Sequence, residues 1–174
     1  FLFSRSFQLM TKYGTIETLK ILSDTSVIIS EGEVLEISND KNLEMNEDTY
    51  FQVINGKTAS LFSTACQVGG LSGGAKDNEL LALKSFGTNF GMTFQLIDDA
   101  IDYSSNLNTM GKNIGDDFKE GKITLPIILA YGRSNDKEKQ FWQKVISKPN
   151  GNVNNFNLAK ELIIKYKCIE DTLI

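Results

Sequence analysis

Histidine is absent from this 174-residue sequence, and cysteine occurs only twice, as Cys66 and Cys168. Without histidine, the segment cannot perform Ser-His or Cys-His nucleophilic catalysis. Two cysteines that lie far apart in the sequence are too few for a disulfide scaffold or a zinc site. We therefore expect reduced, buried thiols in a cytoplasmic protein, and any chemistry must come from other side chains.

Long apolar runs and blocks of basic residues are also missing. No stretch approaches the roughly eighteen apolar residues that a transmembrane helix requires, and we expect no signal peptide. The net charge of −4, from 18 basic and 22 acidic residues, argues against nucleic acid as a partner. No amphipathic basic helix supports an association with membranes.

Proline is scarce, because only Pro126 and Pro149 interrupt the chain, and long helices are therefore permitted almost everywhere. Hydrophobic residues make up 41% of the sequence, which suits a single domain with a core over residues 1–174. Strand-type alternation is nowhere sustained, and the sequence predicts an all-α fold. The expected helices cover residues 1–13, 15–39, 46 to the glycines at 69–74, 77 to the acidic cluster, 124–131, 136–147 and 158–174.

The segment FQLIDDAID, residues 94–102, places Asp98, Asp99 and Asp102 in a stretch that otherwise reads as a buried helix. An unpaired carboxylate is costly against a core, so this cluster needs cations or solvent. Aspartate oxygens suit Mg²⁺, which keeps several waters and binds one or two carboxylates plus phosphate oxygens. A solvated acidic helix end is the alternative interpretation.

Helical spacing also predicts how this segment is oriented. At about 3.6 residues per turn, one face carries two glycines and the polar groups, namely Gly87, Gly91, Gln95, Asp98 and Asp102. An apolar stripe lies about 100° away around the helix and comprises Phe86, Phe90, Phe94, Ile97 and Ile101. We expect the apolar stripe to pack and the glycine face to leave room beside the negative charge.

A loop rich in glycine and lysine follows the acidic cluster and extends through Lys122. Its glycines allow positive φ or a close approach of the backbone, and its lysines lie within a few residues of the carboxylates. Such a loop is one way to hold a metal-bound polyphosphate, with ammonium groups on the outer oxygens. The alternative is a polar surface loop with incidental salt bridges. The residues concerned are Gly111, Lys112, Gly115, Asp116, Asp117, Lys119, Gly121 and Lys122.

The pair Lys57 and Thr58 puts a cation in an otherwise apolar stretch. A lysine that extends its ammonium group to the surface is one explanation. The string Gly56-Lys57-Thr58 imitates the end of a phosphate-binding P-loop, but Phe51 stands where that motif requires a glycine. A P-loop is therefore excluded.

The run FQLIDDAIDY with GKNIGDDFKEGKITLP closely resembles the second aspartate-rich region, DDxxD, of the trans-prenyltransferases, the polyprenyl (isoprenyl) diphosphate synthases. FLFSRSFQLM, EGEVLEI and GKTASLF resemble further segments of that family in the same order. The resemblance covers nearly the whole chain and is strongest to bacterial synthases of the octaprenyl type. It implies an isoprenoid-synthase bundle of long, mostly antiparallel helices, of which this chain is the central and C-terminal part.

The resemblance also implies roles for individual residues. Asp98, Asp99 and Asp102 match metal-binding and catalytic positions, with Mg²⁺ as the cofactor. Positions that contact the allylic diphosphate match Lys57, Thr58, Gln95, Lys112 and Lys122, with Lys57 also catalytic. Asp116, Asp117 and Lys119 rank lower, as residues that order the loop. Glu36 stands where the family usually has Gln or Asp, so no role is carried over to it.

The activity that the resemblance implies is Mg²⁺-dependent condensation of isopentenyl diphosphate with an allylic diphosphate of the geranyl or farnesyl type. The product is a long-chain all-trans polyprenyl diphosphate for isoprenoid or quinone side chains, and the family implies a homodimer. The family's first aspartate-rich motif is missing, so we expect a partial domain that is inactive in isolation. A non-catalytic regulatory subunit of a heteromeric prenyltransferase and a generic Mg²⁺- or Ca²⁺-binding helical domain are the alternatives.

Overall fold

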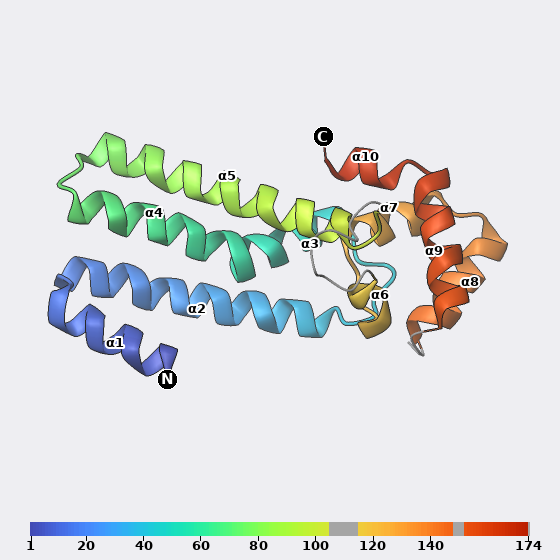
Figure 1. The fold of residues 1–174 in the computed structure, drawn as a ribbon, viewed down its shortest axis with the longest axis horizontal. Coiled ribbons are helices and arrows are strands. Elements are labelled where there is room, and N and C mark those ends of the chain that lie inside the picture. Colours follow the sequence, from blue (N-terminus) through green and yellow to red (C-terminus); the bar gives the residue numbers. More distant parts are fainter. Residues whose placement is uncertain (105–114, 148–151, 174) are drawn as a thin grey trace. The chain divides into compact units, whose positions relative to one another are not determined.

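The structure is a computed structural model, and it describes residues 1–104, 115–147 and 152–173. Every regular element in these ranges is helical, so the predicted all-α class is confirmed (Figure 1). In these ranges no helix is long and apolar enough to cross a membrane. In chain order the elements are α1 Leu2–Tyr13, α2 Ile16–Ser38, α3 Glu47–Ile54, the π-helix η1 Asn55–Ala59, α4 Ser60–Ser72, α5 Asp77–Ile101, α6 Asp116–Glu120, α7 Leu125–Arg133, α8 Asp136–Ser147, α9 Val153–Lys165 and α10 Cys168–Thr172.

The helix bounds follow local signals in the sequence, but α6 was not expected and two of the expected helices differ from those observed. The stretch expected as one helix from residue 46 to the glycines is divided into α3, η1 and α4. The last expected helix begins earlier, because Asn152 caps α9 by accepting the backbone N–H of Asn154 at 2.9 Å. It then breaks at Lys167, which adopts a left-handed conformation (φ 54°) before α10.

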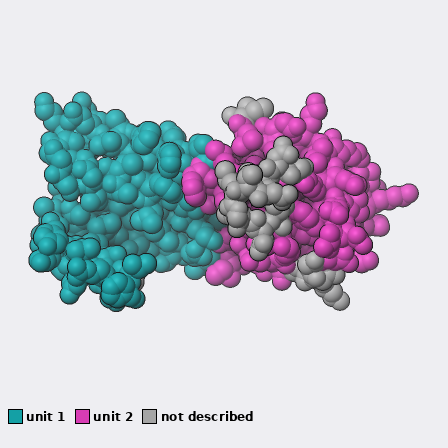
Figure 2. Space-filling model, viewed as in Figure 1, with its two compact units in different colours: residues 1–35, 53–93 teal, residues 36–52, 94–174 magenta. Residues whose placement is uncertain are grey.

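The chain divides into two compact units, shown in different colours in Figure 2. Unit 1 comprises residues 1–35 and 53–93, and unit 2 comprises residues 36–52 and 94–174. Each unit is described by itself below. The expectation of one partial domain over residues 1–174 stays a prediction.

Unit 1 is an antiparallel arrangement of α2, α4 and the first part of α5, which glycines and small polar residues hold close together. A Cβ at Gly87 would lie 2.6 Å from the Phe62 carbonyl oxygen, so the glycine face of α5 packs directly on α4. On the α2 side, the hydroxyl groups of Thr25 and Thr64 form a buried hydrogen bond of 2.6 Å. The polar bond satisfies groups that burial would otherwise penalise.

The predicted packing face of α5 was therefore wrong. Phe86 is 62% exposed and Phe90 50% exposed, and Phe94 and Ile97 are also exposed. The glycine face packs instead, because a residue without Cβ lets the backbone of α4 approach more closely than a phenylalanine stripe permits.

Unit 2 is organised around α7, which α8, α9 and α10 contact. Pro126 lies in the first turn of α7, where a missing N–H costs no hydrogen bond. The largest side chain in this core, Trp142, is fully buried and donates its indole N–H to Ser134 at 3.1 Å. Buried with it are Ile127, Ile146, Ile163 and Cys168. Phe156 of α9 contacts the rings of Tyr103, which follows α5, and Phe118 of α6, and so links this core to both segments.

Candidate active site

The aspartates at the C-terminal end of α5 differ in burial although they lie within five residues of one another. Asp99 is buried at 3% exposure, whereas Asp98 and Asp102 are half-buried. Successive residues are about 100° apart around a helix, so Asp98 and Asp99 lie on different sides of α5. Asp102 follows Asp98 by four residues and lies near the same side.

Asp99 is held on both of its oxygens. Tyr50, in the unit 2 part of α3, donates its hydroxyl to Oδ2 at 2.6 Å, and Gln95 donates its amide N–H to Oδ1 at 2.7 Å. Burial raises the pKa of Asp99 to about 7, while these two hydrogen bonds act in the opposite direction. Gln95, which was predicted to contact a diphosphate, thus contacts an aspartate in this structure.

Asp102 fixes the segment that follows the loop. Its Oδ1 accepts the backbone N–H groups of Gly115 at 3.1 Å and Asp116 at 3.3 Å, and its Oδ2 accepts that of Asp117 at 3.2 Å. Gly115 has φ +80°, and a Cβ there would lie 2.6 Å from the ring of Phe156. Burial raises the pKa of Asp102, and the charge of Asp117 adds to the effect. The position of the backbone at residues 115–117, which follow the loop, therefore depends on Asp102.

The carboxylates of the short helix α6 form ion pairs with two nearby lysines. Lys119 contacts Asp116 at 2.7 Å, and Lys122 contacts Asp117 at 3.2 Å and Glu120 at 2.9 Å. The hydrogen bond to Glu120 is the main cause that raises the pKa of Lys122. Lys112 and Gly111 lie outside the described residues. Cations and carboxylates of the predicted site thus meet in unit 2, next to the aspartates of α5.

Lys57 and Thr58 lie in unit 1, on the π-helix η1. A Cβ at Gly32 of α2 would lie 2.6 Å from the Lys57 nitrogen and 2.9 Å from the Gly56 carbonyl carbon. The backbones of α2 and η1 are therefore in direct contact at Lys57. The Lys57 ammonium group lies 3.6 Å from a Glu33 carboxylate oxygen, with both side chains partly exposed. Single-turn π-helices occur frequently at functional sites.

The carboxylates fit a magnesium ion that other groups help to hold. Within the described ranges, no three Asp, Glu or Cys side chains are close enough together to bind a metal ion. Mg²⁺ needs only one or two protein carboxylates, because waters and substrate phosphates complete its octahedral shell. Asp98 and Asp102, on one side of α5, would supply such a pair of hard oxygen ligands.

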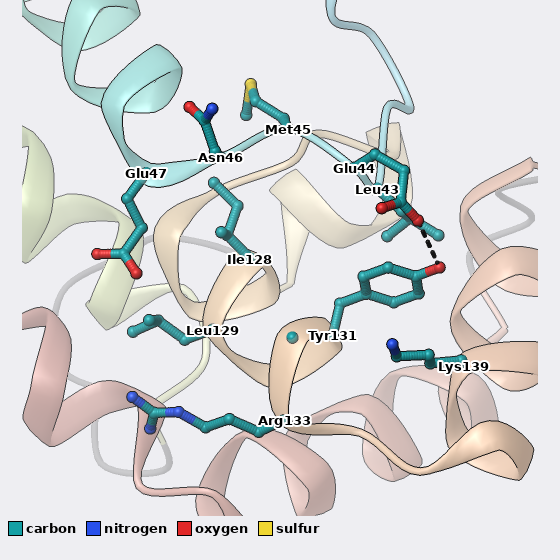
Figure 3. Close-up of a pocket in the computed structure, with 11 residues that line it drawn as sticks. Leu43, Glu44, Met45, Asn46, Glu47, Ile128, Leu129, Tyr131, Arg133 and Lys139 are labelled. Carbon is teal, nitrogen blue, oxygen red and sulfur yellow. Dashed lines mark hydrogen bonds between the residues drawn. The ribbon is translucent and has the colours of Figure 1, made fainter.

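A hollow of about 390 Å³ in unit 2 is lined by none of the predicted site residues (Figure 3). It lies between residues 43–47 and α7, and Tyr131 donates its hydroxyl to Glu44 at 3.0 Å on its wall. Arg133, also on the wall, is 2.6 Å from Asp171 and donates to the carbonyl of Tyr166. Arg133 is thus paired with a carboxylate outside the lining of the hollow, and Glu44 is bound to a tyrosine hydroxyl.

Sequence reasoning missed Tyr50 and Gly32 as residues that hold the site. Tyr50 is 49 residues from its partner Asp99, and no local pattern links the two. Gly32 sits within the EGEVLEI segment, where the sequence shows only a glycine inside a helix. Such a glycine costs helix stability and so signals a packing reason, but the signal does not identify the partner.

Solved structures share this fold closely. A polyprenyl synthase from Caulobacter crescentus CB15, complexed with calcium and isoprenyl diphosphate, has a TM-score of 0.92 and 41% identity over 98% of this chain and 52% of its own. A decaprenyl diphosphate synthase from Rhodobacter capsulatus has a TM-score of 0.88 and 43% identity over 98% and 53%. The architecture is therefore that of the polyprenyl synthases, as the resemblance predicted.

Sequence relatives agree with the structures. Octaprenyl diphosphate synthase of Escherichia coli (strain K12) is 38% identical over 87% of this chain and 47% of its own length. Heptaprenyl diphosphate synthase component 2 of Bacillus subtilis (strain 168) is 36% identical over 75% and 37%. Residues 1–163 match the polyprenyl synthetase family, and the chain belongs to that family. It spans about half the length of the curated relatives it matches.

Proposed function

We propose that the whole protein elongates prenyl chains, condensing isopentenyl diphosphate with an allylic diphosphate of the geranyl or farnesyl type. The product would be a long-chain all-trans polyprenyl diphosphate for isoprenoid or quinone side chains. The observation that carries this proposal is the end of α5, where Asp98 and Asp102 share one side beside a segment that Asp102 itself holds in place. Membership of the polyprenyl synthetase family supports the reaction class.

The proposed site residues form two groups, one that binds the metal ion and one that binds the diphosphate. Asp98 and Asp102 are the proposed ligands of Mg²⁺, which when bound supplies positive charge to a leaving diphosphate. Lys57, Thr58, Gln95, Lys112 and Lys122 are the proposed contacts to the allylic diphosphate. Asp99, the third predicted ligand, is the subject of the further inference below.

The proposed mechanism needs no protein base. Lysine ammonium groups neutralise the charge that develops as the allylic C–O bond breaks, and the resulting cation is attacked by the double bond of isopentenyl diphosphate. The departing diphosphate then accepts the proton that is lost, so the absence of histidine is no obstacle. Exclusion of water by apolar helices would protect the cation from hydrolysis. A homodimer is proposed from the family resemblance alone.

The test uses the full-length protein with Mg²⁺, isopentenyl diphosphate and farnesyl diphosphate, and sizes the dephosphorylated products by chromatography. Asp98→Ala and Lys57→Ala are expected to lower elongation by at least about a hundredfold, as the removal of one group that stabilises transition-state charge does. Asp136→Ala and Lys84→Ala, which remove exposed charges on α8 and α5, serve as matched controls and should retain elongation. Equal activity of all four variants would contradict the assigned roles.

A regulatory subunit is the second candidate, because one relative carries the name of a component of heptaprenyl diphosphate synthase. In that case the full-length protein alone would form no product, but would change the product length of a catalytic prenyltransferase. The same chromatography separates the two candidates. Inactivity of residues 1–174 in isolation stays a prediction, which the same assay on that segment checks.

A further inference from the structure

Tyr50 is a buried tyrosine for which the proposed reaction has no use so far. It is 3% exposed, and its hydroxyl group lies 2.6 Å from Oδ2 of Asp99. The bond joins α3 to the end of α5 within unit 2. Burial and the Asp99 charge raise the pKa of Tyr50, so the phenol keeps its proton and remains the donor.

The geometry around Asp99 suits an anchor better than a metal ligand. Both carboxylate oxygens accept short hydrogen bonds, and only 3% of the residue is exposed. Asp102 also accepts hydrogen bonds on both oxygens, but it is half-buried and so keeps part of its surface open to solvent. A Mg²⁺ ion that also binds phosphate and water needs oxygens on an open side. Asp98, which lies about 100° away around the helix, is half-buried and therefore more accessible than Asp99.

The anchor has a consequence for its neighbours. Because a helix rotates as a rigid rod, fixing Asp99 against α3 also fixes the direction in which Asp98 and Asp102 leave α5. Asp102 in turn holds the backbone of Gly115 to Asp117. Loss of the anchor would therefore let the metal-binding pair move together.

We propose that Tyr50 is a positioning residue, which acts through Asp99 to set the metal-binding geometry of Asp98 and Asp102. The inference rests on the proposed function for the role of the metal. It refines the prediction of three aspartate ligands to two ligands and one anchor. The groups that hold ligands in place commonly change metal affinity by about 10- to 100-fold when they are removed.

The test measures Mn²⁺ binding to the full-length protein by electron paramagnetic resonance, in the presence of inorganic diphosphate. Tyr50→Phe, which removes one oxygen, is expected to weaken Mn²⁺ binding about tenfold. Tyr131→Phe is the matched control, because it also removes a buried hydroxyl that donates to a carboxylate, that of Glu44, and it should bind Mn²⁺ as the wild type does. Equal affinities in both variants would overturn the proposal.

A double-mutant cycle tests whether Tyr50 acts through Asp99. In an Asp99→Ala background, Tyr50→Phe should cause no further loss of Mn²⁺ affinity, because the anchor is already gone. A second loss of about tenfold in that background would show that Tyr50 acts by another route, and would overturn the proposal.

Asp99→Asn decides the matter even if Tyr50→Phe fails to fold. The asparagine oxygen can still accept the Tyr50 hydroxyl, and the Gln95 amide can turn to accept the new N–H. An anchor therefore predicts Mn²⁺ affinity within about threefold of the wild type, whereas loss of a direct ligand predicts a decrease of at least about tenfold. The larger decrease would overturn the proposal.

The outcomes also separate this inference from the proposed function. If the wild type binds Mn²⁺ and the variants behave as expected, but no product forms, then the elongation proposal fails and the anchor stands. If the wild type elongates prenyl chains but Tyr50→Phe matches Tyr131→Phe in Mn²⁺ affinity, then the anchor fails and the function stands.

Discussion

The two units hold their proposed functional residues by different physical means. In unit 1, close packing of the backbone determines the position of Lys57, because the glycines Gly32 and Gly56 bring two backbones into direct contact beside it. In unit 2, the aspartates are placed by hydrogen bonds, with Tyr50 on Asp99 and backbone N–H groups on Asp102. The salt bridge of Lys57 to Glu33 is comparatively long, at 3.6 Å, and partly exposed.

This difference has a practical consequence. A close backbone contact of this kind is sensitive to a single added methyl group and insensitive to pH. A network of hydrogen-bonded carboxylates responds to protonation and to the loss of one hydrogen-bond donor. It tolerates a substitution that keeps the size of the side chain and its hydrogen bonds. The two regions should therefore fail under different perturbations.

The largest expected effect is a pH dependence of stability that belongs to unit 2. Burial raises the pKa of Asp99 from 3.8 to about 7, so the folded state binds this proton more tightly than the unfolded state. The resulting stabilisation is complete below about pH 4 and is lost as the pH rises through 7. Asp99→Asn cannot titrate, so its stability should rise relative to the wild type across this window, by at most about 4 kcal/mol.

Denaturant unfolding of the full-length protein in metal-free buffer between pH 4 and 8 checks this difference. Asp136→Asn, at an exposed position of α8, is the control and should follow the wild type throughout. A constant difference between Asp99→Asn and the wild type would show that Asp99 does not titrate in this range.

The next effect belongs to unit 1 and should be independent of pH. Gly32→Ala places a Cβ 2.6 Å from the Lys57 nitrogen, so the backbones must separate, at a cost of about 3 kcal/mol in unfolding free energy. Gly69→Ala, where no atom lies within 4 Å of the new Cβ, should instead stabilise α4 by about 0.5 to 1 kcal/mol. Chemical denaturation of both variants measures the difference, and losses of equal size would refute the close contact at Gly32.

The features that could be predicted from the sequence are those that depend on residues close together along the chain. The helical class, most helix bounds and the position of the aspartates in a helix all follow from spacing, capping residues and the scarcity of proline. Long-range contacts decided the rest. The choice of the glycine face of α5 for packing depends on α4, and the turn of π-helix at Lys57 coincides with a glycine contact from α2. The bond from Tyr50 to Asp99 links residues with no local relation.

The smallest expected effect concerns the exposed salt bridge of Lys57. Glu33→Gln should change the free energy of unfolding by less than about 0.5 kcal/mol, because exposed pairs gain little in water. The apparent KM for the allylic diphosphate should change by less than about threefold, since close backbone packing rather than Glu33 determines the position of Lys57. Steady-state kinetics of the full-length protein measure this value, and a change of tenfold or more would give Glu33 a positioning role.

The claim that the end of α5 binds metal is tested most directly by counting bound Mn²⁺ ions. Electron paramagnetic resonance of the full-length protein with inorganic diphosphate would compare the wild type with Asp98→Ala and Asp136→Ala. The account predicts that Asp98→Ala binds at least one Mn²⁺ ion fewer, or binds it at least about tenfold more weakly, while Asp136→Ala is unchanged. Unchanged number and affinity in Asp98→Ala would contradict it.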